Sequence, residues 1–490
     1  MKVPISTAEI SFARHWPKLA ILILYFAVIL SASLAHAMWR DEIQAWLIAR
    51  DSADLSALFH NLHYEGHAAL WYLLLLPLAR FNSDPRSMQL LHVVIATFSV
   101  ALVLWRAPLS RLEQVLFPFG YFFVFEYAIK SRGYALGCLF VFLFCAFWRL
   151  RKQSPVMVAI ILALMANVDI LFMIISIAAM LALAADRLIG RPLVGRETPT
   201  AWQSDLIAVV IILFGWTLAV ATALPPSDSG NAVGWLFGWS LPRFEWILGA
   251  LRVLFTPQKS IWANLATGTI LAIAFVRSRT NPPAAIFLVV SVLGLLTFFY
   301  TKYAGGIWHH GLIFIVVFAT VWIDRTEQES RSRLSRQYLV PAMFFVVILA
   351  FQVYGGVSAV LNDVYHPLSR ARDVARFIVA KGWAAEPIVG FPDYAIAPIV
   401  GYLGIRQAYY PQGSRWGSFT IWDQRRLGPL NFDQALVEVK RFGSAGTWIA
   451  EVTADDPDLM RKYGFAEVAN FSGAEAENYI VYRRSADLVH

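Results

Sequence analysis

Long apolar runs separated by short polar segments make up the chain as far as residue 356. A helix needs roughly 20 predominantly apolar residues to cross a bilayer. Runs that meet or approach this length predict eleven crossings, two of them within 155–186 and the others at 19–37, 88–105, 112–129, 134–150, 203–224, 259–276, 282–299, 309–323 and 338–356. This pattern predicts a polytopic α-helical membrane protein with about eleven transmembrane helices.

Basic residues beside these runs predict their orientation. Lys and Arg gather in cytoplasmic loops, and here they gather at alternate ends of the runs, at 106–111, 149–152, 187–196 and 277–279. The N-terminal segment is then cytoplasmic and the long loop 38–87 is external. Residues 68–81 are apolar but number only fourteen, and a crossing there would reverse every later loop. We therefore expect a juxtamembrane or re-entrant helix at 68–81.

Two of the runs allow more than one interpretation. The stretch 155–186 is 32 residues long and is interrupted at Asp169, with basic residues at both ends. We predict two short spans with Asp169 at an external turn; the alternative is one long tilted helix. The run 19–37 resembles a signal peptide because Ala35-His36-Ala37 mimics a cleavage site. Nineteen apolar residues are long for a signal core, which favours an uncleaved anchor.

Residues 357–490 have a different character from the apolar part. Charged residues are common there, and short strand-like runs alternate with amphipathic helix-like ones. The strand-like runs are 387–391, 447–452 and 479–482, and the helix-like runs are 370–380, 432–442 and 456–463. Alternation of this kind predicts a small α/β domain. The chain therefore divides into a transmembrane domain at 1–356 and an extracytoplasmic α/β domain at 357–490.

Composition narrows the class of protein. The chain is 58% hydrophobic and only 15% charged, whereas soluble domains carry about 25% charged residues. The net charge of +8 is explained by cytoplasmic loops, so we expect membrane lipids as partners and no nucleic acid. The two cysteines, Cys138 and Cys145, lie in one apolar run and are too far apart along a helix to form a disulfide.

Two adjacent carboxylates, Asp41 and Glu42, follow the first apolar run directly. Desolvating a charged side chain costs several kcal/mol, so both need water, a cation or a chemical role. A solvated first turn of a helix is the simple alternative, because helix-spaced apolar positions follow at 43–50 and at 55–62. Both stretches are typical of amphipathic helices lying along the membrane interface.

Three segments resemble one family of membrane enzymes. The acidic pair Asp41-Glu42 is followed by His67-Ala68-Ala69-Leu70-Trp71-Tyr72 and then by Ser131-Arg132-Gly133-Tyr134-Ala135-Leu136. Their order is similar to that in membrane glycosyltransferases of the C-type fold, the class of the protein O-mannosyltransferases and lipid A aminoarabinose transferases. Ala stands at both positions where the family's second segment has Pro.

This resemblance implies a transferase that uses a polyprenyl-phosphate sugar as donor, loaded from the external side of a bacterial inner membrane. The acceptor would be a hydroxyl of a glycan, a lipid or a protein at the periplasmic face. Asp41 would be the catalytic base, and Glu42 would orient the acceptor or bind a cation. Such a transfer also needs positive charge on the leaving phosphate and a groove for the donor lipid.

Candidate phosphate ligands occur on the predicted external loops. The cationic or potentially cationic ones are Arg86, Arg132, Lys302, His309 and His310, with Lys130 beside them. Arg can bind two phosphate oxygens at once, whereas Lys acts as a point charge. Basic residues at span ends also extend towards lipid headgroups, which is the alternative for Arg86, Lys130 and Arg132. Gly305-Gly306 would allow the 302–310 loop to close over a ligand.

Further polar and aromatic residues are candidates for binding substrate: His63, Glu65, His67, Tyr72, Tyr134, Asp169 and Tyr303. In an extended segment, alternate residues face one way, so His63, Glu65 and His67 could hold a divalent cation. The alternatives are an acceptor-binding loop or a solvated loop. Asp169 could equally be a helix N-cap.

Two other functions fit parts of the pattern. A transporter or flippase of lipid-linked sugars would use a similar cavity, but transporters place ionisable residues at the membrane midplane and show inverted repeats. Here the polar clusters lie at span ends and the sequence has no internal repeat. A non-catalytic assembly protein whose tail binds a partner is the third possibility.

Overall fold

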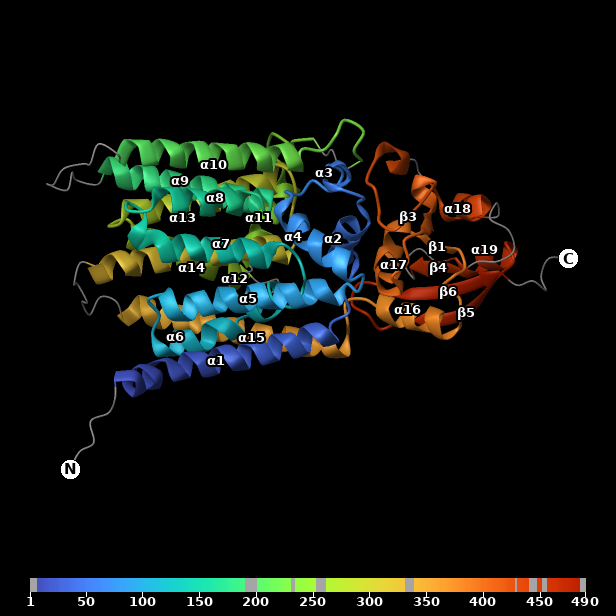
Figure 1. Cartoon of the computed structure of the whole chain (residues 1–490), viewed down its shortest axis with the longest axis horizontal. Helices are drawn as coiled ribbons and strands as arrows, with labels where there is room; N and C mark the ends of the chain where they lie inside the picture. Colours follow the sequence, from blue (N-terminus) through green and yellow to red (C-terminus); the bar gives the residue numbers. More distant parts are fainter. Residues whose placement is uncertain are drawn as a thin grey trace, which may run out of the picture.

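A bundle of helices forms one end of the molecule, and a mixed sheet flanked by helices forms the other (Figure 1). The computed structural model describes residues 7–189, 201–230, 234–252, 261–330, 339–427, 430–439, 447–451 and 456–484. Arg191 and Arg196 of the predicted cytoplasmic cluster at 187–196 lie outside the described residues, as do residues 440–442 of a predicted helix.

The bundle contains ten of the eleven predicted runs as helices. Seven are long and apolar enough to cross a membrane: α1 (Thr7–Ala35), α5 (Arg86–Arg106), α9 (Ile170–Ile189), α10 (Ala201–Ala223), α13 (Pro282–Thr301), α14 (Ile307–Ser330) and α15 (Leu339–Tyr365). Three are shorter apolar helices, α7 (Tyr134–Phe147), α8 (Pro155–Ala166) and α12 (Ile261–Ser278). Since α8 and α9 pack together with Asp169 between them, the split of 155–186 is confirmed and a single long helix is wrong.

The run 112–129 is not the regular helix that its hydropathy predicts. It consists of α6 (Arg111–Leu116), a 3₁₀ turn at Phe117–Phe119 and a π-helical turn at Phe122–Glu126. Pro118 lacks a backbone N–H, and Gly120 is extended, so the α-helical ladder stops here. The segment packs against α1, α14 and α15, where its aromatic rings are buried.

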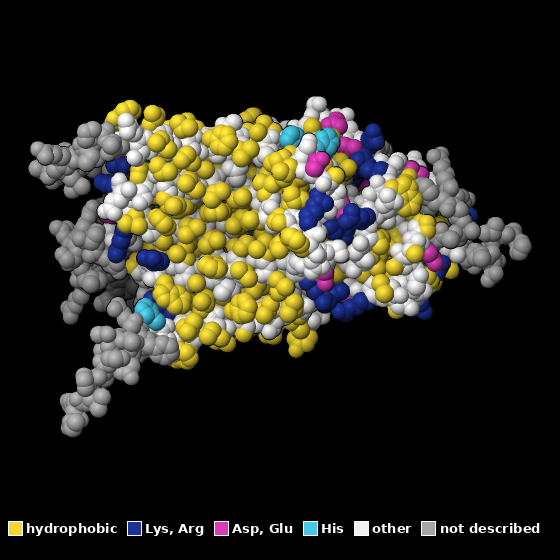
Figure 2. All heavy atoms as spheres, in the orientation of Figure 1, with side chains coloured by type: hydrophobic (Ala, Val, Ile, Leu, Met, Phe, Trp, Pro, Cys, Tyr) yellow, Lys and Arg dark blue, Asp and Glu magenta, His cyan; other side chains and the backbone are white. Residues whose placement is uncertain are grey.

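Charged side chains mark the two ends of the bundle, and hydrophobic side chains cover its flank (Figure 2). Ion pairs join several connections at the end far from the sheet. Arg325 pairs with Glu113 at 2.7 Å, and Arg151 pairs with both Asp186 and Glu327 at 2.9 Å. The described parts of the basic clusters that were predicted to share one side of the membrane therefore lie together at one end of the bundle.

Three short helices lie at the opposite end: α2 (Arg40–Asp51), α3 (Leu55–Leu62) and α4 (Leu70–Phe81). The predicted helices are confirmed, but α2 is not the half-exposed amphipathic helix that its spacing predicts. Most of α2 is buried, because it packs between α4 and α17 (Ala397–Leu403). A further helix that was not predicted, α11 (Leu241–Arg252), packs against α12, α13 and α14.

The sheet has the strand order β3-β2-β1-β4-β6-β5. Its strands are β1 (Ile388–Phe391), β2 (Ala408–Tyr410), β3 (Arg415–Gly417), β4 (Thr447–Glu451), β5 (Phe465–Phe471) and β6 (Tyr479–Arg484). β1 is parallel to both β2 and β4, and the remaining pairs are antiparallel. The sheet helices besides α17 are α16 (Ala371–Ala380), α18 (Phe432–Val439) and α19 (Pro457–Lys462).

Alternate strand residues face opposite sides of this sheet. Ile388, Tyr410 and Val481 join the core that is continuous with the helical bundle. Val389 and Tyr482 belong to a separate small core under α18 and α19. The sheet is therefore packed directly onto the end of the bundle that carries α2, and this junction contains a cavity.

Candidate active site

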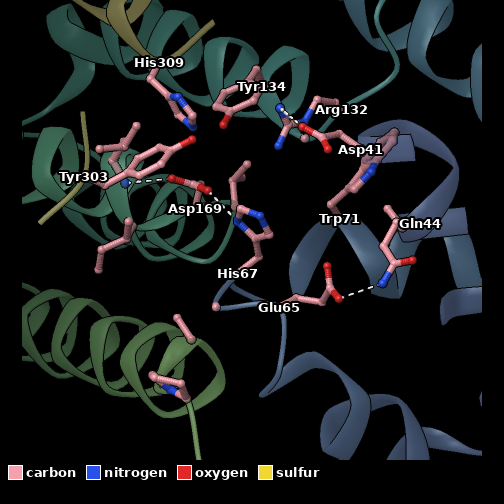
Figure 3. A pocket seen from close by; sticks show the side chains of 18 of the residues that line it. Asp41, Gln44, Glu65, His67, Trp71, Arg132, Tyr134, Asp169, Tyr303 and His309 are labelled. Atoms are coloured by element: carbon pink, nitrogen blue, oxygen red, sulfur yellow. Dashed lines mark hydrogen bonds and ion pairs between the residues drawn. The ribbon is translucent and has the colours of Figure 1, made fainter. Parts of the chain in front are cut away.

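A cavity of about 700 Å³ lies where the bundle meets the C-terminal region (Figure 3). One wall is apolar and comes from the ends of α10 and α13 with Trp235. The other is polar and comes from α2, the loops around residues 65, 132 and 169, and the turn before α14. Three residues of the C-terminal region, Tyr394, Thr420 and Trp422, complete the lining. A pocket of this size with one apolar and one polar wall suits an amphiphilic ligand.

Asp41 is the carboxylate of the acidic pair that faces the cavity. It lies in the first turn of α2, and its side chain is 35% exposed. Its Oδ2 is 3.4 Å from a guanidinium nitrogen of Arg132. Figure 3 shows both side chains at the same corner of the cavity. A partly exposed carboxylate whose charge is balanced by one cation can reach a substrate hydroxyl and accept its proton.

Glu42, the next residue, points into the protein and does not line the cavity. Its Oε1 accepts a hydrogen bond from the Ser131 backbone N–H at 2.5 Å, and its Oε2 lies 2.9 Å from Nε2 of His36. The other ring nitrogen of His36 is 2.8 Å from Asp363 in α15. Glu42 therefore ties three segments together, and its position does not fit the expected direct contact with an acceptor or a cation.

The loop that carries Arg132 is held from two sides. Glu42 binds its Ser131 N–H, and the two ring nitrogens of His92 contact the carbonyl oxygens of Ala128 and Arg132 at 3.0 and 2.9 Å. The Arg132 guanidinium also lies over the rings of Tyr134 and Trp308, 5.3 and 5.4 Å from their centroids. These contacts fix a cation at the cavity wall.

Glu65 lines the cavity opposite Arg132. The amide of Gln44 donates to Glu65 Oε1 at 2.9 Å, and the same amide pairs with both backbone groups of Thr420. Burial raises the pKa of Glu65 to about 7, although the Gln44 hydrogen bond and the charge of His67 act in the opposite direction. Glu65 is thus a carboxyl group that can change its protonation state near neutral pH.

His67 and Asp169 form an ion pair in the cavity wall, with Nδ1 and Oδ2 3.0 Å apart. Burial would raise the pKa of Asp169, but the hydrogen bond and the charge of His67 hold it below its ordinary value. Burial would likewise lower the pKa of His67, but Asp169 raises it. Asp169 Oδ1 also accepts the Leu171 N–H at 2.9 Å, so Asp169 caps α9 as the alternative interpretation predicted.

The proposed cation ligands do not converge. Glu65 and His67 line the cavity, but His63 lies at the end of α3 outside it. His67 contacts Asp169 and Glu65 contacts Gln44. Within the described ranges, no three His, Cys, Asp or Glu side chains are grouped so that they could hold a metal ion. The 63–67 segment is therefore no preformed three-residue site.

Only some of the candidate substrate-binding residues on the turn between α13 and α14 line the cavity. Lys302, Tyr303 and His309 line the cavity, whereas His310 does not. The Nε2 of His310 lies 2.8 Å from the Ala304 carbonyl, and its ring packs against Phe299. Gly305 has φ +76°, a conformation that L side chains rarely adopt. The glycine therefore serves a tight, internally bonded turn.

The structure thus brings together most of the predicted residues. Asp41, Glu65, His67, Tyr72, Arg132, Tyr134, Asp169, Lys302, Tyr303 and His309 line the cavity, whereas Glu42, His63, Arg86 and His310 do not. Arg86 is exposed at the start of α5. Gln44 was not predicted, although its spacing from Asp41 on α2 could have indicated it. Tyr394, Thr420 and Trp422 were not predicted either, and their local sequence carries no signal for such a site.

The sequence matches no protein-family model, and a search of curated proteins finds no match. Among solved structures, the chain is similar to ArnT from Cupriavidus metallidurans bound to undecaprenyl phosphate, with a TM-score of 0.53 and 10% identity over 97% of this chain and 99% of that one. It is also similar to the oligosaccharyltransferase AglB from Archaeoglobus fulgidus in complex with an inhibitory peptide and a dolichol-phosphate, with a TM-score of 0.41 and 9% identity over 98% and 75% of the two chains. As the three sequence segments predicted, the protein has the fold of the C-type membrane glycosyltransferases.

Proposed function

We propose that this protein is a membrane glycosyltransferase that moves a hexosyl or pentosyl group from a polyprenyl-phosphate donor to an acceptor hydroxyl of a glycan, a lipid or a protein. The reaction would occur at the external, periplasmic face of a bacterial inner membrane. The observation that carries the proposal is the cavity that combines Asp41, its partner Arg132 and the cation Lys302 with an apolar wall from α10 and α13.

The chemistry follows from these positions. Asp41 accepts the proton of the acceptor hydroxyl while the acceptor oxygen bonds to C1 of the sugar. The bond from C1 to the phosphate oxygen breaks, and polyprenyl phosphate leaves with the electron pair. Arg132 and Lys302 balance the charge that the leaving phosphate gains. One base without a separate nucleophile makes this a single displacement, which inverts the configuration at C1.

The two walls suit the two parts of the donor. Val220, Leu224 and Phe298 form an apolar surface near the bundle exterior, which suits a polyprenyl chain. Lys302 lies beside this surface, with Nζ 5.5 Å from the Trp235 ring centroid. A phosphate at Lys302 would therefore have its lipid in an apolar environment and its sugar directed towards Asp41.

Replacing Asp41 tests this function. Asp41→Asn removes the base and retains the shape of the side chain. General base catalysis contributes roughly 10²–10⁴ in rate, so we expect transfer from synthetic polyprenyl-phosphate sugars to fall at least a hundredfold. The exposed Glu467→Gln is the control and should retain full turnover. Near-normal turnover by purified, folded Asp41→Asn protein would refute the role of Asp41.

A further inference from the structure

The rim of the cavity farthest from the bundle is assembled from three distant segments. The Tyr64 hydroxyl donates to Asp228 at 3.1 Å. Gly230 N–H donates to the Trp422 carbonyl, and Gln424 N–H donates to the Asp228 carbonyl, both at 2.7 Å. Hydrogen bonds therefore join three segments: the loop after α3, the loop after α10 and the 420–424 segment of the C-terminal region. This rim lies outside the helices that are long enough to cross a membrane.

Several backbone groups at this rim already have partners. Both backbone groups of Thr420 are bonded to Gln44, at 3.1 and 2.6 Å, and the Trp422 carbonyl accepts from Gly230. A peptide that bound here would find no main-chain partner at these positions. Side chains are then the main groups left at these positions to recognise a ligand, and the apolar wall that suits a lipid is formed by other residues.

Tyr394 and Trp422 at this rim form a fixed pair of stacked aromatic rings. The rings of Tyr394 and Trp422 stack with centroids 6.1 Å apart and an interplanar angle of 24°. The guanidinium of Arg40 covers Tyr394 at 4.7 Å, and that of Arg426 covers Trp422 at 4.2 Å. With their faces covered, the rings present their edges. Within the described residues, neither the Tyr394 hydroxyl nor the Trp422 indole N–H forms a hydrogen bond.

Two other groups of cavity-lining residues also lack partners. The Trp71 indole nitrogen and the Thr420 hydroxyl are buried on cavity-lining residues and have no hydrogen-bond partner in the described part of the chain. A buried polar group without a partner costs about 1–3 kcal/mol. Glu65 uses one oxygen for Gln44, which leaves the other oxygen as an acceptor. The rim thus combines one carboxyl acceptor with the Tyr394 hydroxyl, the Trp422 indole N–H and aromatic edges.

This combination matches the chemistry of a sugar ring. Each sugar hydroxyl can both donate and accept a hydrogen bond, so it can bond to the Glu65 carboxyl group, the Tyr394 hydroxyl and the Trp422 N–H. Asp41 and Gln44 lie three residues apart on the cavity-lining face of α2, so their Cβ atoms are about 5–6 Å apart. A ring held beside Gln44 and Glu65 could therefore present a hydroxyl to Asp41.

We propose that Glu65, Tyr394 and Trp422 form an acceptor subsite for a sugar residue, so that the acceptor is a glycan. The inference rests on the proposed function and specifies its acceptor. The C-terminal region then supplies part of the substrate site. The lipid of the donor and the ring of the acceptor occupy opposite walls of one cavity, with Asp41 between them.

The test separates donor use from acceptor use. Purified full-length protein in lipid nanodiscs is supplied with a panel of synthetic polyprenyl-phosphate hexoses and pentoses. Release of free sugar without an acceptor reports donor turnover. Transfer is then measured to methyl glycosides and short neutral oligosaccharides, to a Ser/Thr-rich peptide and to lipid A. Glu65→Gln, Trp422→Ala and the milder Trp422→Phe are compared with Glu467→Gln and Trp416→Ala, which alter residues outside the cavity lining.

We expect transfer to saccharides, with an acceptor KM at least tenfold higher in Glu65→Gln and Trp422→Ala and a donor KM within twofold of the unmodified protein. Trp422→Phe retains an aromatic ring and loses the N–H, so its acceptor KM should lie between those of Trp422→Ala and the unmodified protein. Transfer only to the peptide, or acceptor KM values unchanged in both variants for saccharides and lipid A alike, would overturn the subsite while the transferase function stands. If the unmodified protein turns over no donor in the panel, the proposed function fails and the subsite fails with it.

Discussion

At the scale of single residues, the adjacent carboxylates have different environments. Asp41 faces the cavity, whereas Glu42 is buried and binds the Arg132 loop. Successive residues on a helix point about 100° apart, so one of two neighbours usually faces inward when the other faces a pocket. The sequence predicted the acidic pair but could not show which of the two carboxylates faces the cavity, because that depends on which side of α2 the bundle packs against.

Lys302 and Arg86 give a matched comparison of the predicted phosphate ligands. Lys302 lines the cavity and Arg86 does not. A hydrogen bond to a charged group contributes roughly 1.5–3 kcal/mol, which corresponds to about tenfold or more in binding. We expect Lys302→Ala to raise the apparent KM for donor about tenfold and to lower kcat, with little change in acceptor KM. Steady-state kinetics with a polyprenyl-phosphate sugar measures both constants.

Arg86→Ala is the control, because it removes a cation from the same end of the bundle without changing the cavity. Its donor KM should match that of the unmodified protein. A Lys302 variant that binds donor normally but loses acceptor affinity would place this turn on the acceptor side. The phosphate role would then fall to Arg132.

Glu65 gives a prediction about pH. Because burial raises its pKa to about 7, the group is ionised above that pH and protonated below it. An ionised carboxylate accepts stronger hydrogen bonds from a hydroxyl. The acceptor KM should therefore rise as pH falls through about 7, and Glu65→Gln should remove this step. The charges of His67, Asp41 and Arg132 act on Glu65. A step that persists in Glu65→Gln would identify one of the other groups as its source.

At the scale of secondary-structure elements, α2 shows where pattern analysis succeeds and where it stops. Helical spacing predicted α2, but the apolar side alone suggested a helix on a surface. In the structure, its second side is covered by α17, which lies more than 340 residues later in the chain. Likewise, the 112–129 run has the hydropathy of a span, yet its irregular turns depend on Pro118 and on contacts with α14 and α15.

Close packing of α17 on α2 can be tested at a glycine. A Cβ added at Gly401 would lie 2.6 Å from Ile43 Cγ2, so Gly401→Ala must push the two helices apart. Overpacking of this kind costs typically 1–3 kcal/mol, and a small shift of α2 also moves Asp41. We expect a lower melting temperature in detergent and a kcat reduced by about tenfold or more, since misplacing a reacting group by about 1 Å can cost a hundredfold.

Gly268→Ala in α12 is the matched control, because a Cβ there meets no atom within 4 Å. Alanine is the better helix former by roughly 0.5–1 kcal/mol, so this variant should melt at the same or a slightly higher temperature and retain full activity. Equal behaviour of the two variants would show that contact between α2 and α17 does not position the acidic motif.

At the scale of the whole molecule, hydropathy and charge predicted most of the bundle because the transfer of a segment into lipid depends on the residues of that segment alone. The cavity depends instead on contacts between segments that are distant in the chain. Asp41, Arg132 and Lys302 could be nominated by type and by loop, whereas Tyr394 and Trp422 lie in a region whose local pattern predicts only strands and helices. Their place at the cavity follows from how the sheet packs on α2, which single-sequence patterns do not encode.

Orientation in the membrane is the last prediction. The basic clusters share the end far from the sheet, so we expect that end in the cytoplasm. Single cysteines at exposed positions can test this, because both native cysteines are buried. Asp84→Cys and Glu467→Cys should react with an impermeant maleimide in intact spheroplasts. Thr280→Cys, between α12 and α13, should react only after lysis.

Two outcomes would contradict this orientation. Because α4 lies between Asp84 and the first span, protection of position 84 with labelling of position 467 would mean that α4 crosses the membrane. The number of crossings between positions 84 and 467 would then be odd. Protection of both, with labelling at 280, would invert the molecule and exclude a periplasmic cavity.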